Sequence, residues 1–110
     1  MIRINLKPLS VNKAWQGRRF KTDKYKAYEK HALLLLPPLK LPQPPYQITI
    51  EFGLSNVMSD WDNPVKPLQD ILQKKYGFND KDVLRASVEK TKVAKGEEYF
   101  EFQIDHYDQT

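Results

Sequence analysis

The chain has 110 residues, with 18 Lys and Arg against 14 Asp and Glu, a formal net charge of +4, and no Cys. This length suits one compact domain, so we expect residues 1–110 to form a single domain. The lack of Cys excludes a disulfide framework, a thiolate zinc site and a cysteine nucleophile. Carboxylates and other oxygen ligands must hold any metal.

The first strand is predicted over residues 2–7, where Ile2, Ile4 and Leu6 alternate with polar residues before Pro8. This alternation differs from the continuous apolar core of a signal peptide, so we expect a cytoplasmic protein with no membrane partner. A helix is predicted from residue 21 to residue 36, with Thr22 as its cap. Its apolar stripe has spacings of three and four and consists of Tyr25, Tyr28, Ala32 and Leu35.

The N-terminal third of the chain is strongly basic. Residues 1–30 carry nine basic groups against Asp23 and Glu29, which gives this segment a net charge of +7. Such an asymmetry fits a polyanionic partner that binds a basic surface. A solvated lysine-rich face explains the same charges equally well, and composition alone does not separate the two interpretations.

Residues 37–45 hold five of the eight prolines and are expected to form a stiff connector within the domain. The clearest strand follows over residues 46–54, where apolar and polar residues alternate. A second helix is predicted over residues 64–75, irregular in its first turn because of Pro67, with Asn63 as cap and Gly77 beyond its end. Its buried stripe should be Val65, Leu68, Ile71 and Leu72.

Two further strands are predicted around residues 84–88 and 100–104, paired as a hairpin through a turn at Lys95 and Gly96. The element order is therefore strand, helix, strand, helix, hairpin. It predicts an α+β fold, in which helices pack on a small mixed sheet.

Carboxylates gather where the 46–54 strand gives way to the second helix. Asp60 and Asp62 project to the same side of an extended chain and could meet one hard cation. The return of the chain after Gly77 could bring Asp80 beside them, and three carboxylates around Mg²⁺ are suited to phosphodiester hydrolysis. Asp70 lies too far along the helix to share the ion. Lys66 could neutralise Asp70 or face a phosphate.

A purely structural interpretation stays open, in which Asp62 and Asn63 cap the helix and Asp80 belongs to an Asn-Asp turn. An EF-hand is excluded because Val65 and Ile71 stand where its loop requires glycine and glutamate. Zincin chemistry is disfavoured because the only histidines, His31 and His106, are far apart. An aspartyl-phosphate phosphatase is a weak alternative, because its aspartates usually follow a buried parallel strand.

The spacing of these residues resembles that of a known family. The run Asp60-x-Asp62-Asn63-x-x-Lys66-x-x-x-Asp70-x-Leu72, followed by Gly77 and Asn79-Asp80-x-x-Val83, is similar to the RusA family of Holliday-junction resolvases. Pro8-x-Ser10-x-Asn12-Lys13, Gly17-Arg18-Arg19 and the Lys95-Gly96 turn also fit, so the resemblance covers nearly the whole chain. One departure is that the family often has two adjacent acids after the glycine, whereas Lys81 separates Asp80 from Asp82 here.

The resemblance implies a homodimeric endonuclease that uses Mg²⁺, with Mn²⁺ as an alternative, and places paired nicks across four-way junction DNA. It implies no small organic cofactor. The catalytic residues would be Asp60, Asp62, Asp80 and Lys66, with the three aspartates as metal ligands and Asp82 as a substitute for Asp80. The DNA-binding residues would be Asn12, Lys13, Arg18, Arg19, Lys21 and Lys24. The alternative from a different class is a non-catalytic basic DNA-binding module.

Overall fold

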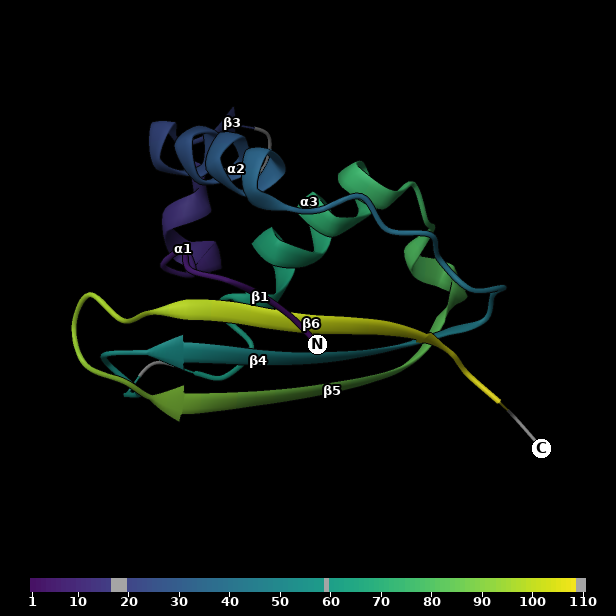
Figure 1. Ribbon diagram of the computed structural model, residues 1–110. Helices are drawn as coiled ribbons and strands as arrows, with labels where there is room; N and C mark the ends of the chain where they lie inside the picture. Colours follow the sequence, from purple (N-terminus) through teal and green to yellow (C-terminus); the bar gives the residue numbers. More distant parts are fainter. Residues whose placement is uncertain (17–19, 59, 109–110) are drawn as a thin grey trace.

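A four-stranded mixed sheet forms one layer of the protein, and two helices lie on one of its faces (Figure 1). The computed structural model describes residues 1–16, 20–58 and 60–108. The strand order is β1-β6-β4-β5, with bounds Ile2–Ile4 for β1, Tyr99–His106 for β6, Tyr46–Leu54 for β4 and Val83–Lys92 for β5. The predicted α+β class, with helices packed on a mixed sheet, is confirmed.

The parallel pair in this sheet comes from one strand–helix–strand unit. β4 leads into helix α3 (Val65–Tyr76), a 3₁₀ turn η1 (Asp80–Asp82) follows, and β5 then pairs with β4 in parallel. β6 lies between β1 and β4 and is antiparallel to both. The predicted hairpin between the last two strands is therefore wrong, because β4 separates them. β6 buries Tyr99, Phe100, Phe102 and Ile104 and needs a central place, whereas the mostly exposed β5 suits an edge.

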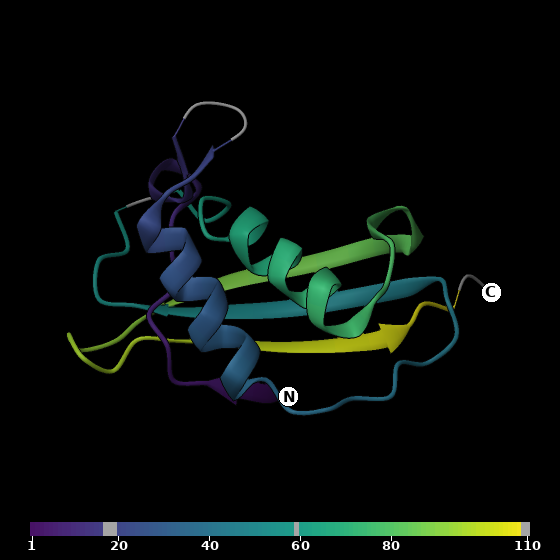
Figure 2. The same cartoon turned by 90° about the horizontal axis from the view of Figure 1, so that it is seen from above.

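The core lies between the sheet and helices α2 (Asp23–Leu35) and α3, which cross the same face of the sheet (Figure 2). The largest fully buried side chains include Tyr25 of α2, Leu68 of α3 and Phe102 of β6. Leu68, Ile71 and Leu72 are buried as the sequence predicts, whereas Val65 is only half-buried. Within the described part of the chain, no helix has the length and apolar character that crossing a membrane requires.

The N-terminal segment forms a small structure of its own beside the helices. It contains helix α1 (Val11–Ala14) and a two-stranded sheet of β2 (Trp15–Gln16) and β3 (Phe20–Lys21). The predicted cap of the next helix is confirmed, since the Thr22 side chain accepts a hydrogen bond from the Tyr25 backbone N–H at 3.2 Å. The first strand is shorter than predicted and ends at Ile4.

The start of α3 differs from the prediction. Pro64, not Asn63, is the N-cap, and no side chain caps the helix there. The helix is regular from Val65, because Pro67 falls at the third helical position, where the missing N–H would have no intrahelical partner. Gly77 ends the helix at φ 73°, a left-handed conformation that favours glycine, as expected.

Candidate nucleic-acid interface

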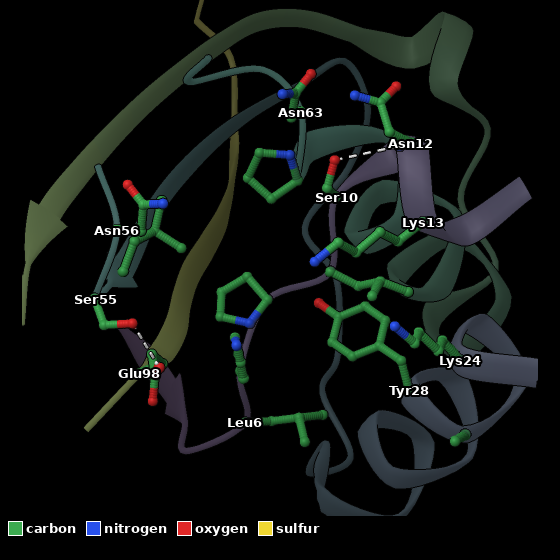
Figure 3. A pocket seen from close by; sticks show the side chains of 16 residues that line it. Leu6, Ser10, Asn12, Lys13, Lys24, Tyr28, Ser55, Asn56, Asn63 and Glu98 are labelled. Atoms are coloured by element: carbon green, nitrogen blue, oxygen red, sulfur yellow. Dashed lines mark hydrogen bonds between the residues drawn. The ribbon is translucent and has the colours of Figure 1, made fainter. Parts of the chain in front are cut away.

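A cavity of about 680 Å³ opens where the N-terminal segment meets the end of β4 and the loop before α3 (Figure 3). Three lysines line it, namely Lys7, Lys13 and Lys24. Its polar lining also includes the side chains of Ser10, Asn12, Ser55, Asn56 and Asn63. Amines and amides that converge on one hollow are suited to a polar anion, because each of them can donate hydrogen bonds.

Helix α1 is fixed beside the acidic turn, which contains Asp60 and Asp62 and precedes α3. The Ser10 hydroxyl accepts a hydrogen bond from the Asn12 backbone N–H at 3.2 Å and begins the helix. The Val11 N–H donates to the Asn63 carbonyl at 2.7 Å, which ties α1 directly to the residues after Asp62. Asn12 and Lys13, both expected to bind DNA, thereby belong to a helix that is bonded to the turn bearing the carboxylates expected to hold metal, although Asp62 lines a different groove with Trp61 and Lys66.

Backbone hydrogen bonds hold the acidic turn in its conformation. The Asn63 N–H donates to the Asp60 carbonyl at 3.2 Å, and the Val65 N–H donates to the Asp62 carbonyl at 3.0 Å. Asp60 and Asp62 are exposed, and within the described ranges neither carboxylate pairs with a cation. The interpretation in which the Asp62 and Asn63 side chains cap α3 is therefore wrong, since no side chain does so.

Lys66 is the second residue of α3, and its side chain is engaged with a carboxylate. Its Nζ donates to Asp70 Oδ1 at 2.9 Å, while the Lys66 side chain remains 61% exposed. This contact is the i,i+4 pair that the sequence offered as one of two roles for Lys66. Such an exposed pair contributes little to the free energy of unfolding. Lys66 can therefore leave Asp70 and bind another anion with little loss of stability.

Asp80 lies at the opposite end of α3. It belongs to η1, where the Asn79 side chain accepts a hydrogen bond from the Lys81 N–H at 3.1 Å, as an Asn-Asp turn would have it. The 12 residues of α3 span roughly 18 Å and lie between this turn and Asp62. In the part of the chain that the structure describes, no three His, Cys, Asp or Glu residues gather closely enough to hold a metal ion.

The expectation that Asp80 returns beside Asp60 and Asp62 is therefore wrong for a single chain. Asp82, its expected substitute, belongs to the same distant turn. Within residues 1–16, 20–58 and 60–108, one chain taken alone does not bring together the three carboxylates of the expected Mg²⁺ site.

The other expected DNA-binding residues divide into separate groups. Lys24 lines the cavity, whereas the Lys21 Nζ bonds to Glu29 Oε2 at 3.2 Å and lies 5.0 Å from the centre of the Tyr25 ring. Arg18 and Arg19 lie outside the described residues. The structure thus gathers Asn12, Lys13 and Lys24 at one site and directs Lys21 toward α2.

Sequence reasoning missed Glu98, which brings a carboxylate to the cavity wall. The Glu98 side chain accepts hydrogen bonds from the Ser55 hydroxyl at 2.9 Å and from the Gly96 N–H at 2.8 Å (Figure 3). Its own backbone N–H, the Ser55 hydroxyl and the Gly96 N–H together lower the pKa of Glu98. The predicted turn at Lys95 and Gly96 was a sequence signal close to Glu98. The hydrogen bond from Ser55 could not be predicted, because Ser55 is far away in the sequence. Glu98 thus places one negative charge opposite the three lysines.

Compared with models of known protein families and with curated protein sequences, the chain matches none. The function must therefore be inferred from the residues themselves and from their arrangement.

Proposed function

We propose that this protein is a Mg²⁺-dependent endonuclease that binds four-way DNA junctions and hydrolyses their phosphodiester bonds. One observation carries the proposal. The 2.7 Å hydrogen bond from Val11 to Asn63 joins the helix that bears Asn12 and Lys13 to the turn that bears the exposed aspartates. The helix suited to hold a phosphate and the turn suited to hold a cation are therefore joined directly.

The basic cavity supports backbone binding. Lys7, Lys13 and Lys24 bring three positive charges to it, and Asn12 and Asn63 add amide donors. Side chains of these types contact phosphate oxygens and recognise shape and charge without reading bases. A protein that selects a branched junction by its shape needs contacts of this kind.

The acidic turn supports the chemistry. Asp60 and Asp62 are exposed on one turn, and oxygen ligands of this type are those that Mg²⁺ takes in phosphate-processing sites. Among the residues that the structure describes, neither carboxylate pairs with a cation, which leaves both available. The hydrolytic assignment also draws on the family resemblance of the sequence, whereas the cavity by itself supports only binding.

The test is incubation of the purified protein with a synthetic four-way junction and a matched linear duplex, with and without Mg²⁺. We expect nicks in the junction only, paired across it, and only with Mg²⁺. Asp62→Asn should abolish nicking and leave junction binding intact or tighter, because one negative charge near the phosphate is removed. Asp105→Asn on β6 is the matched control and should cut normally. Cleavage by Asp62→Asn at the wild-type rate would refute the assignment.

Lys66 provides a second test of the same surface. Lys66→Ala should lose cleavage, whereas Asp70→Asn should retain it, because Lys66 rather than its helical partner is expected to face the phosphate. Retained cleavage by Lys66→Ala would reduce Lys66 to the surface partner of Asp70. If the wild-type protein shifts the junction in a gel but produces no nicks in Mg²⁺, the non-catalytic DNA-binding module is the correct class.

A further inference from the structure

A second hollow of the molecule lies between α3 and β5, apart from the basic cavity. It is an open groove of about 590 Å³, and the two hollows have no lining residue in common. The acidic turn, the start of α3 and the middle of β5 each contribute to the groove, with Trp61 and Asp62, Val65 and Lys66, and Ala86 and Val88, respectively. The groove therefore begins at the turn that bears the proposed metal ligands.

The part of the groove on β5 is apolar and only partly covered. Ala86 and Val88 stand opposite Ile48 and Ile50 of β4, so these side chains face the helix layer. Whereas the two isoleucines are buried, Ala86 is exposed and Val88 is half-buried. The helices thus leave a strip of apolar surface along β5 that a flat, apolar group could cover.

Trp61 is the largest side chain of the groove, and it is 56% exposed. The other tryptophan, Trp15, lies 5.7 Å from the Tyr25 ring, measured between ring centres. Trp61, in contrast, contacts no aromatic ring among the described residues. An indole in this situation can stack on a flat ligand, and every nucleobase offers such a flat face.

The groove also carries groups suited to the backbone of the same nucleotide. Lys66 is 61% exposed, and its exposed pair with Asp70 leaves it able to bind a phosphate. Asp62 follows Trp61 in the chain and lines the same groove. One groove therefore combines an aromatic side chain, a cation and a carboxylate proposed to hold metal.

Stacking on Trp61 requires a base whose face is free. In a continuous duplex each base is paired and lies between its neighbours, so a side chain can stack only on a base that is unpaired or taken out of the stack. We infer that the groove binds an unpaired base of branched DNA against Trp61, with the adjoining phosphate at Lys66. The place of that phosphate rests on the proposed function, and Trp61 acts as a positioning residue.

Fluorescence tests the stacking directly. Trp15→Phe leaves Trp61 as the only tryptophan of the chain. Titration in EDTA with a duplex that carries a single-stranded oligothymidylate tail should quench the Trp61 emission, because a base stacks on the indole. The matched blunt duplex should bind about tenfold more weakly and quench much less. Equal affinity for the two duplexes, or a saturated tailed complex without quenching, would overturn the inference.

Two substitutions separate stacking from simple apolar cover of β5. Trp61→Phe keeps an aromatic ring and should keep the preference for the tailed duplex. Trp61→Leu keeps apolar bulk without a ring, and should lose about tenfold in affinity for the tailed duplex while its affinity for the blunt duplex is unchanged. Leu84→Ala is the matched control, because Leu84 is an exposed apolar residue of β5 outside the groove. Wild-type affinity of Trp61→Leu for the tailed duplex would refute the role of Trp61.

Cleavage in Mg²⁺ distinguishes this inference from the proposed function. The wild type should nick a four-way junction with one unpaired nucleotide at its branch point faster than a fully paired junction, and Trp61→Leu should remove the difference. Quenching by the tailed duplex without nicks in any junction would refute the proposed function and leave the stacking intact. Nicking of junctions without quenching would refute the stacking alone.

Discussion

The basic cavity makes a quantitative prediction about salt. Each phosphate that a lysine neutralises on duplex DNA contributes about 0.9 to the slope of log affinity against log salt, through counterion release. Lys13 and Lys24 line the cavity from α1 and α2, and neither forms an ion pair among the described residues. The double variant Lys13→Ala/Lys24→Ala should therefore lower the slope by about 1.8. Between 50 and 200 mM salt, wild-type affinity should fall by about tenfold more than that of the variant.

The measurement is fluorescence anisotropy of a labelled four-way junction over a series of KCl concentrations, in EDTA so that binding alone is observed. Lys40→Ala/Lys75→Ala is the matched control, because it removes two exposed lysines that do not line the cavity. The control should change the slope by much less than the cavity variant. Equal slopes for the wild type and the cavity variant would refute the assignment of this cavity to phosphate binding.

Two further predictions concern stability. A Cβ at Gly53 would overlap the Tyr99 ring across the β4–β6 pair, so Gly53→Ala should cost about 1–3 kcal/mol in urea unfolding; unchanged stability would refute this packing. Burial raises the pKa of Glu29, but hydrogen bonds from Lys74 and Lys21 outweigh it and lower the pKa below the ordinary 4.5. Glu29→Gln should therefore cost about 0.5–1 kcal/mol at pH 7, and this difference should vanish as pH falls through the lowered pKa; a pH-independent difference would contradict it.

Local periodicity was sufficient to predict much of the secondary structure. The residues of β4 alternate along the whole strand, and the structure gives this strand the predicted bounds. The Thr22 cap and the buried positions Leu68, Ile71 and Leu72 also followed from spacing within a few residues. These features depend on neighbours in the chain, so a single sequence contains their cause.

Strand order could not be predicted in the same way. The short turn at Gly96 suggests that β5 and β6 pair with each other, but β6 pairs with β4 and β1 instead. The difference depends on total burial, because four apolar residues of β6 are buried, three of them (Phe100, Phe102 and Ile104) on the face toward the helices, while most β5 side chains remain exposed. The spacing of residues within one strand does not show which of two distant strands will be the more deeply buried.

The position of Asp80 follows from the same topology. In a parallel strand–helix–strand unit the helix carries the chain back to the end of the sheet where the first strand began. Asp62 precedes α3 and Asp80 follows it, so the helix separates them whatever their spacing in sequence.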